Sequence, residues 1–117
     1  MTDLQLNPVD IERRIDEISN RIAMSVKVVS ERESVAREKR TAFDEAYAHA
    51  YLAAQDSPAH ERKYRATLAT ITERRDAEVA ETAYKYADRK ASALEKELFA
   101  WQSISKSVVA MYGAVRS

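Results

Sequence analysis

The segment Gln55-Asp56-Ser57-Pro58 is the only credible interruption in a chain that otherwise avoids helix-breaking residues. The 117 residues include a single glycine and two prolines. A domain of this length built from strands needs many tight turns, whereas two long helices need only one. Ser57 suits the N-cap of a helix and Pro58 suits its first residue, because proline has a helical φ and no N–H to leave unpaired. We therefore expect the chain to turn at residues 56–57.

Apolar residues before this turn recur at helical spacing. They follow steps of four or three residues, which places them on one face of a helix; the residues are Ile11, Ile15, Ile18, Ile22, Val26 and Val29. Asn7 and Pro8 provide an N-cap and a first helical residue. The stripe is interrupted by a polar stretch at residues 31–40 and then resumes. The sequence predicts helix 1 over about residues 8–55.

A second apolar stripe follows the turn, and Gly113 provides a plausible C-terminal stop. The chain is also rich in alanine, glutamate, lysine, arginine and leucine, which all favour helix. The sequence predicts helix 2 over about residues 58–113, and an all-α fold that forms one domain over residues 1–117. The expected stripe of helix 2 consists of Tyr64, Leu68, Ile71, Val79, Ala83, Tyr86, Leu94, Leu98, Trp101, Val108 and Tyr112.

The short connection makes the two predicted helices antiparallel neighbours. A turn at residues 56–57 pairs positions whose numbers sum to about 113. Apolar zones then face each other, and the polar stretch at residues 31–40 faces residues 73–82. Up to Pro58 the chain has 8 basic and 11 acidic residues, and after it 11 basic and 8 acidic. Opposite charges of −3 and +3 favour pairing, so we expect a long, coiled-coil-like antiparallel helical hairpin.

The end of this hairpin near the termini carries more apolar side chains than one seam requires. Residues beyond about Ser105 have no partner in helix 1 under the pairing rule. Because two helices alone bury little surface, we expect self-association through this end into a dimeric helical bundle. The predicted interface consists of Trp101, Ile104, Val108, Val109, Met111, Tyr112, Val115, Ile11 and Ile15, although simple core packing explains part of this group equally well.

Charge and composition exclude several classes of function. Lysine plus arginine and aspartate plus glutamate each number 19, so no net field attracts polyanions, and a general nucleic-acid coat is disfavoured. There is no cysteine for a disulfide or thiol site. The N-terminal segment lacks the pattern of a secretory signal, and no stretch of about 18 apolar residues occurs. We expect a cytoplasmic protein that does not contact membranes.

Catalytic and metal chemistry has little support in the sequence. A helical hairpin offers a seam and no pocket, and one glycine is too few for a phosphate-binding loop. Glu45 with His49, and Asp56 with His60, have a spacing that a divalent metal can use. The simpler interpretation is two solvated histidines on a charged surface. We therefore expect no enzyme activity, no metal site and no cofactor.

One stretch of helix 2 resembles a nucleic-acid contact. Basic residues alternate there with tyrosines, as they do in proteins that stack single-stranded bases. The possible contacts are Lys85, Arg89 and Lys90. On a helix, however, Tyr86 is expected in the seam and the basic residues on a solvated face. Nucleic acid is thus a possible partner and not the favoured one.

Two parts of the chain resemble a known group of proteins. These are Ala50-Tyr51-Leu52-Ala53-Ala54 with Ala66-Thr67-Leu68-Ala69-Thr70, and AYKYADRKASALEKELFAWQSISKSV at residues 83–108 followed by MYG. They are similar to small, uncharacterised helical proteins of tailed bacteriophages and prophages of actinobacterial and other Gram-positive hosts. The resemblance implies a place among early replication and recombination genes. It assigns no functional residue.

Together these observations favour a non-enzymatic, oligomeric helical adaptor of phage type that binds a phage or host protein in the bacterial cytoplasm. Its task would lie in phage DNA recombination or replication, or in host takeover. Two alternatives remain open. The first is an accessory protein that binds single-stranded DNA, and the second is a structural or assembly helper of the virion.

Overall fold

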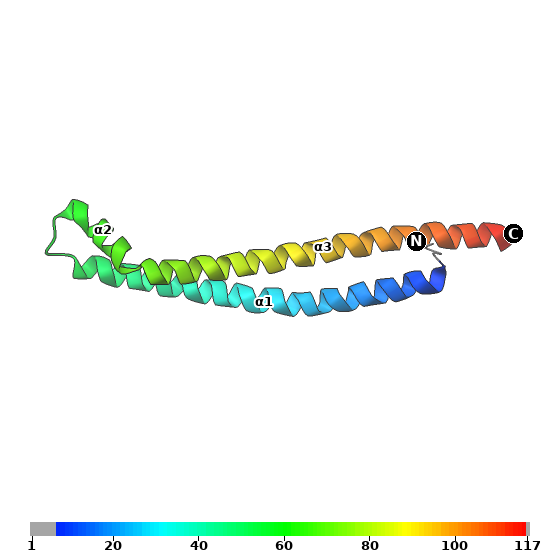
Figure 1. The fold of residues 1–117 in the computed structure, drawn as a ribbon, viewed down its shortest axis with the longest axis horizontal. Helices are drawn as coiled ribbons and strands as arrows, with labels where there is room; N and C mark the ends of the chain where they lie inside the picture. Colours follow the sequence, from blue (N-terminus) through cyan, green and yellow to red (C-terminus); the bar gives the residue numbers. More distant parts are fainter. Residues whose placement is uncertain (1–6, 117) are drawn as a thin grey trace, which may run out of the picture. The chain divides into compact units, whose positions relative to one another are not determined.

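A computed structural model describes residues 7–116, with side chains described up to Gly113. It contains three helices, α1 (Pro8–Ala53), α2 (Ala59–Ala69) and α3 (Ile71–Arg116), as Figure 1 shows. The described residues contain no strand. The all-α prediction is therefore confirmed. No helix in the described part of the chain has the length and apolar character needed to cross a bilayer, and the cytoplasmic location stays a prediction.

The start of α1 follows from local hydrogen bonding at Asn7. The Asp10 backbone N–H donates to Asn7 Oδ1 at 3.0 Å, and Asn7 Nδ2 donates back to Asp10 Oδ2 at 2.8 Å. These bonds satisfy a free N–H of the first turn, and the Asp10 carboxylate lies at the positive end of the helix dipole. The predicted N-cap is confirmed.

The connection after α1 differs from the sequence prediction in its capping. α1 ends at Ala53, two residues before the expected end, and Pro58 rather than Ser57 is the N-cap of α2, without a side-chain cap bond. Arg62 closes the connection instead, because Nε donates to the Ser57 carbonyl at 3.1 Å and Nη2 donates to the Gln55 carbonyl at 3.0 Å. A guanidinium has donors enough to satisfy carbonyls that no helix N–H reaches.

Thr70 divides the segment that was expected to be one helix, so the prediction of two helices is wrong. Thr70 has φ −120° and ψ 24°, and its N–H donates to the Thr67 carbonyl at 3.3 Å. Its hydroxyl donates to the Ala66 carbonyl at 2.7 Å. Threonine side chains compete in this way for helix carbonyls, and here the buried hydroxyl replaces the regular bond. The Arg74 N–H then donates to the Thr70 carbonyl at 3.0 Å, which starts α3.

The described residues form two compact units. Unit 1 combines residues 7–27 of α1 with residues 88–116 of α3, and unit 2 comprises Val28–Ala87. The prediction of a single domain over residues 1–117 stays a prediction.

Unit 1 has a core of large aliphatic side chains. Ile11 and Ile18 are each 1% exposed and are the largest fully buried side chains in the described residues. The Arg14 guanidinium lies 5.6 Å from the centre of the Trp101 ring, a cation–π contact between α1 and α3. Half-buried residues extend this core, namely Ile15 and Ile22 from α1 and Leu94, Leu98 and Val108 from α3.

Unit 2 has a core made mainly of alanine, whose buried members are Ala36, Ala54, Ala66, Ala77, Ala80 and Ala87. The large apolar residues expected in the stripe of helix 2 lie outside it: Tyr64, Leu68, Ile71, Val79 and Tyr86 are all exposed. This part of the predicted stripe is wrong. Alanine recurs at steps of three and four residues in α3, and its small side chain lets two helices approach closely. Larger residues next to it are then turned outward.

Eleven of the buried and half-buried positions of α3 alternate in steps of four and three residues: Glu73, Ala77, Ala80, Tyr84, Ala87, Ala91, Leu94, Leu98, Trp101, Ser105 and Val108. Ala83 and Ile104 are also half-buried, each next to one of these positions. In α1 the same alternation runs from Ile11 to Ala50, except for two consecutive steps of four at Ser25, Val29 and Glu33. Arg40 occupies one of its positions but is exposed, and Ala46 is half-buried outside it. Val26, expected in the stripe, is exposed because the step of three residues from Ile22 reaches Ser25. We call the positions of these two alternations the seam residues.

We expect Ala80→Leu to destabilise the protein by about 1–3 kcal/mol, because Ala80 is buried in the seam and the added atoms have no space between α1 and α3. Urea unfolding followed by circular dichroism measures this change. Ala100→Leu, at an exposed position of α3, is the matched control and should change stability by less than about 0.5 kcal/mol. Equal effects of the two substitutions would show that the alanine seam is not closely packed.

Candidate functional site

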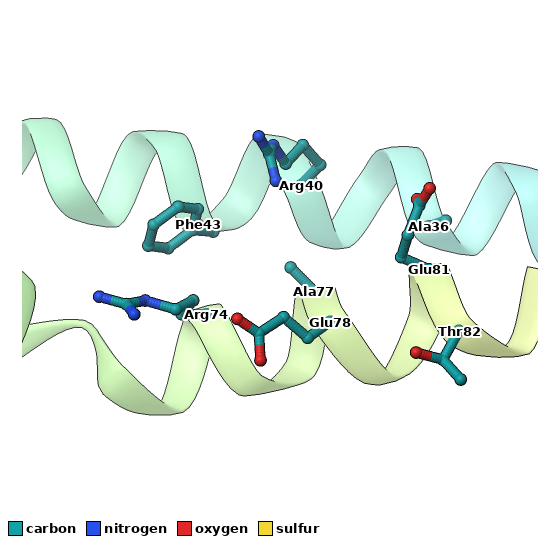
Figure 2. A pocket seen from close by; sticks show the side chains of 8 residues that line it. All are labelled: Ala36, Arg40, Phe43, Arg74, Ala77, Glu78, Glu81 and Thr82. Carbon is teal, nitrogen blue, oxygen red and sulfur yellow. The ribbon is translucent and has the colours of Figure 1, made fainter.

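Unit 2 has a groove of about 550 Å³ between α1 and α3. It forms because alanines fill the seam there and leave space beside it. Figure 2 shows Phe43 and Ala77 directed into the space between the two helices from opposite sides. The lining residues are Ala36, Arg40 and Phe43 from α1 and Arg74, Ala77, Glu78, Glu81 and Thr82 from α3.

The rim of this groove is charged and its floor is apolar. A neighbouring hollow of about 410 Å³ shares Ala36, Arg40 and Glu81 and extends the groove to Arg37. Glu81 pairs with Lys85 at 3.7 Å, and Arg37 pairs with Glu33 at 3.6 Å. These side chains are at least two-fifths exposed, so each pair contributes little to stability. An open groove with a charged rim can receive a chain segment of a partner, but it does not desolvate a small molecule.

The hydrogen-bonded serine and threonine hydroxyls of the described residues donate to backbone carbonyls. Each serine or threonine hydroxyl with a hydrogen bond donates to a carbonyl three or four residues earlier, as Ser103 does to Phe99 at 3.1 Å and Ser25 does to Ile22 at 2.7 Å. A nucleophile needs a neighbouring base within hydrogen-bond reach. These hydroxyls therefore form no nucleophile–base pair, and the prediction that the protein is not an enzyme stays a prediction.

The histidine pairs considered from the sequence do not come together. His60 is exposed and lies 4.0 Å from its neighbour Glu61, and His49 is exposed on α1. Between residues 7 and 116, no three His, Cys, Asp or Glu side chains are close enough to hold a metal ion.

The predicted interface residues fall into three groups in unit 1. Ile11 is buried in the core, where a partner cannot reach it. Four residues are half-buried beside the core: Ile15, Trp101, Ile104 and Val108. The exposed group lies in the last turns of α3 and consists of Val109, Met111 and Tyr112. Val115 belongs to α3, and its side chain lies outside the described residues.

A second groove, of about 420 Å³, lies in unit 1 beside the half-buried Ile15. Sequence reasoning missed its most exposed apolar member, Phe99, which is 72% exposed. The regular spacing of Leu94, Leu98 and Trp101 indicates that Phe99 lies just outside the seam, so the signal was present in the sequence.

The residues proposed to contact nucleic acid are all exposed, but they belong to different units. Lys85 lies in unit 2, where it pairs with Glu81, whereas Arg89 and Lys90 lie in unit 1. Tyr86 was expected in the seam and is instead 61% exposed. Alanine at position 87 takes the seam position, which places the preceding tyrosine on the surface.

Comparisons with models of protein families, with curated proteins and with solved structures gave no match. Function must therefore be argued from the geometry of these surfaces.

Proposed function

We propose that the chain is a non-enzymatic helical adaptor that binds a protein partner through apolar side chains left outside its own core. The observation that supports this most directly is the end of α3. Val109, Met111 and Tyr112 are all at least half exposed there. Exposed apolar groups that gather on one surface mark interaction sites, and Met and Tyr are enriched at interface centres.

The pairing of helices in unit 1 places this end beyond the start of α1. Arg14 lies over Trp101, so Pro8 is level with about residue 107 of α3. α3 continues to Arg116, which is about nine residues, or about 14 Å of helix, beyond that level. A helix end that carries exposed apolar side chains is suited to bind another helix.

The pairing of α1 with α3 and the assembly of the chain are part of the same proposal. In unit 2, Arg32 Nη1 donates to the Ala83 carbonyl at 3.4 Å, and both this pair and Arg14 with Trp101 have numbers that sum to about 115. The sequence predicted that the numbers of paired residues sum to about 113. These contacts support an antiparallel, coiled-coil-like helical hairpin, and we propose that it assembles into a dimeric bundle.

The biological setting that we propose comes from the resemblance to phage proteins alone. It is phage DNA recombination or replication, or host takeover, in the host cytoplasm, with a phage or host protein as partner. A virion assembly helper is an alternative with the same surface chemistry, and its presence in purified particles would favour it.

We expect a tagged full-length chain to retain a protein partner from a lysate of the bacterial host after nuclease treatment. Met111→Lys should abolish this retention, because a charge would be buried in an apolar contact. Ser107→Lys, an exposed position in the same stretch, is the control and should retain the partner. A chain truncated after Ser105 should also lose it. Retention by all variants would exclude the end of α3 as the binding surface.

The exposure of Tyr86 next to Lys85 favours the alternative that the chain binds single-stranded DNA. An exposed tyrosine can stack on a base, and a base stack contributes about 1–3 kcal/mol.

The alternative predicts that a labelled single-stranded oligonucleotide binds the chain and that affinity falls steeply with salt. Fluorescence anisotropy measures both. Tyr86→Ala should then weaken binding by about 5- to 100-fold, whereas the control Tyr112→Ala should not. Absence of binding at low salt would eliminate the alternative and leave the adaptor.

A further inference from the structure

Unit 2 carries a row of apolar side chains outside its seam. Val28 and Val35 lie seven residues apart on α1, and Val79 and Tyr86 lie seven residues apart on α3. Their exposed fractions range from 39% to 70%. The proposed function assigns these residues no role, since it uses the end of α3 in unit 1.

The four side chains lie on the same side of the α1–α3 pair. Each directly precedes a seam residue in its own helix: Val29, Ala36, Ala80 and Ala87 in turn. In two antiparallel helices that face each other, a backward step of one residue from the seam rotates to the same side on both. The groove residues confirm this geometry, because Arg37 and Glu78 directly follow seam residues and line the opposite side.

The apolar residues of α1 and α3 also lie at matching heights along the helix pair. The bond from Arg32 to the Ala83 carbonyl fixes the pairing in unit 2. Val35 is then level with Val79, and Val28 is level with Tyr86. The result is two apolar rungs across the pair, about 10 Å apart along the helices. We call this surface the valine face.

Charges of opposite sign flank the rungs. Lys39 on α1 and Asp76 on α3 also directly precede seam positions, and they are level with each other one turn beyond Val35 and Val79. Next to them, on the outer edges of the two helices, lie Glu38 and Arg75. No ion pair involving any of these four residues occurs among the described residues, although Lys39 and Asp76 face the same side.

We propose that a second copy of this chain docks on the valine face, related by a two-fold axis parallel to the helices. This axis places α1 of one copy over α3 of the other at the same level. Val35 then meets Val79 of the second copy, and Lys39 meets its Asp76. A two-fold axis perpendicular to the helices would instead place α1 on α1. Arg32 and Lys39 of one copy would then face Arg32 and Lys39 of the second copy, and these like charges would repel. Charge therefore selects the parallel axis.

The size of the surface fits a modest dimer. The valine face is about 25 Å long and about 20 Å wide, or about 500 Å² per copy, at the lower limit of specific interfaces. We expect a weak dimer of this size, with a dissociation constant of about micromolar order. The inference rests on the self-association in the proposed function and gives it a surface separate from the end of α3.

The test is sedimentation equilibrium of the full chain at about 1 to about 500 µM, a range that covers such a dimer. Val79→Lys and Val35→Lys should each weaken dimerisation by at least about 30-fold, because a lysine would be buried against valine. Thr41→Lys, on the groove side of α1, adds the same charge and should change the dissociation constant of the dimer by less than about twofold. Circular dichroism checks that each variant keeps its helix content.

Charge exchange tests the axis. Lys39→Asp places aspartate against Asp76 of the second copy, and Asp76→Lys places lysine against Lys39; each should weaken its own dimer by about three- to tenfold. An equimolar mixture of the two variants should recover dimers, because every contact then joins opposite charges. A pair within one chain cannot be restored by mixing. Failure of the mixture to recover would overturn the parallel axis.

Two outcomes would overturn the inference as a whole. The first is a chain that stays monomeric over the full concentration range. The second is a dimer that Val79→Lys leaves intact and Met111→Lys abolishes, which would place self-association at the end of α3. Neither outcome shows whether the chain retains a protein partner from the lysate. The retention experiment with Met111→Lys therefore tests the adaptor proposal separately.

Discussion

Close packing of α1 against α3 through alanine side chains is the constraint on which unit 2 depends. A small seam residue lets the helices approach, but it contributes little apolar area of its own. Ala36 and Ala80 lie deep in the seam, while Val35 and Val79, each one residue away, remain exposed. The same choice of side chain thus opens the groove on one side of the pair and leaves an apolar face on the other. Unit 1 differs because Ile11 and Ile18 fill its core.

The interruptions of the helices are set by polar groups that compete for backbone bonds. Asn7 supplies an acceptor at the start of α1, and Arg62 supplies donors to two carbonyls of the connection before α2. The buried hydroxyl of Thr70 takes a carbonyl from the helix and separates α2 from α3. In each case a side chain satisfies a backbone group that the helix leaves unpaired, so the breaks occur without cost in buried polar atoms.

Function follows from what the core does not use. The proposed surfaces are the exposed apolar side chains at the end of α3 and those on the valine face. On the valine face charges lie beside them, as in protein interfaces where apolar contacts give affinity and charges give orientation. The groove of unit 2 has a charged rim and an apolar floor, and it is open to solvent, which suits a partner segment better than a small molecule. Recognition by helical surfaces is the chemistry that these features share.

The sequence alone determined the all-α fold and the cap at Asn7, because helix propensity and capping are local properties. Most of the core of unit 1 was also predictable, since its isoleucines repeat at helical spacing. The stripe at Val79 and Tyr86 was assigned wrongly, because size was taken as the mark of a core residue. Only the packing of the helices decided which side of α3 faces α1. There the close approach that alanine allows outweighs the burial of larger side chains, and the valine face stays outside.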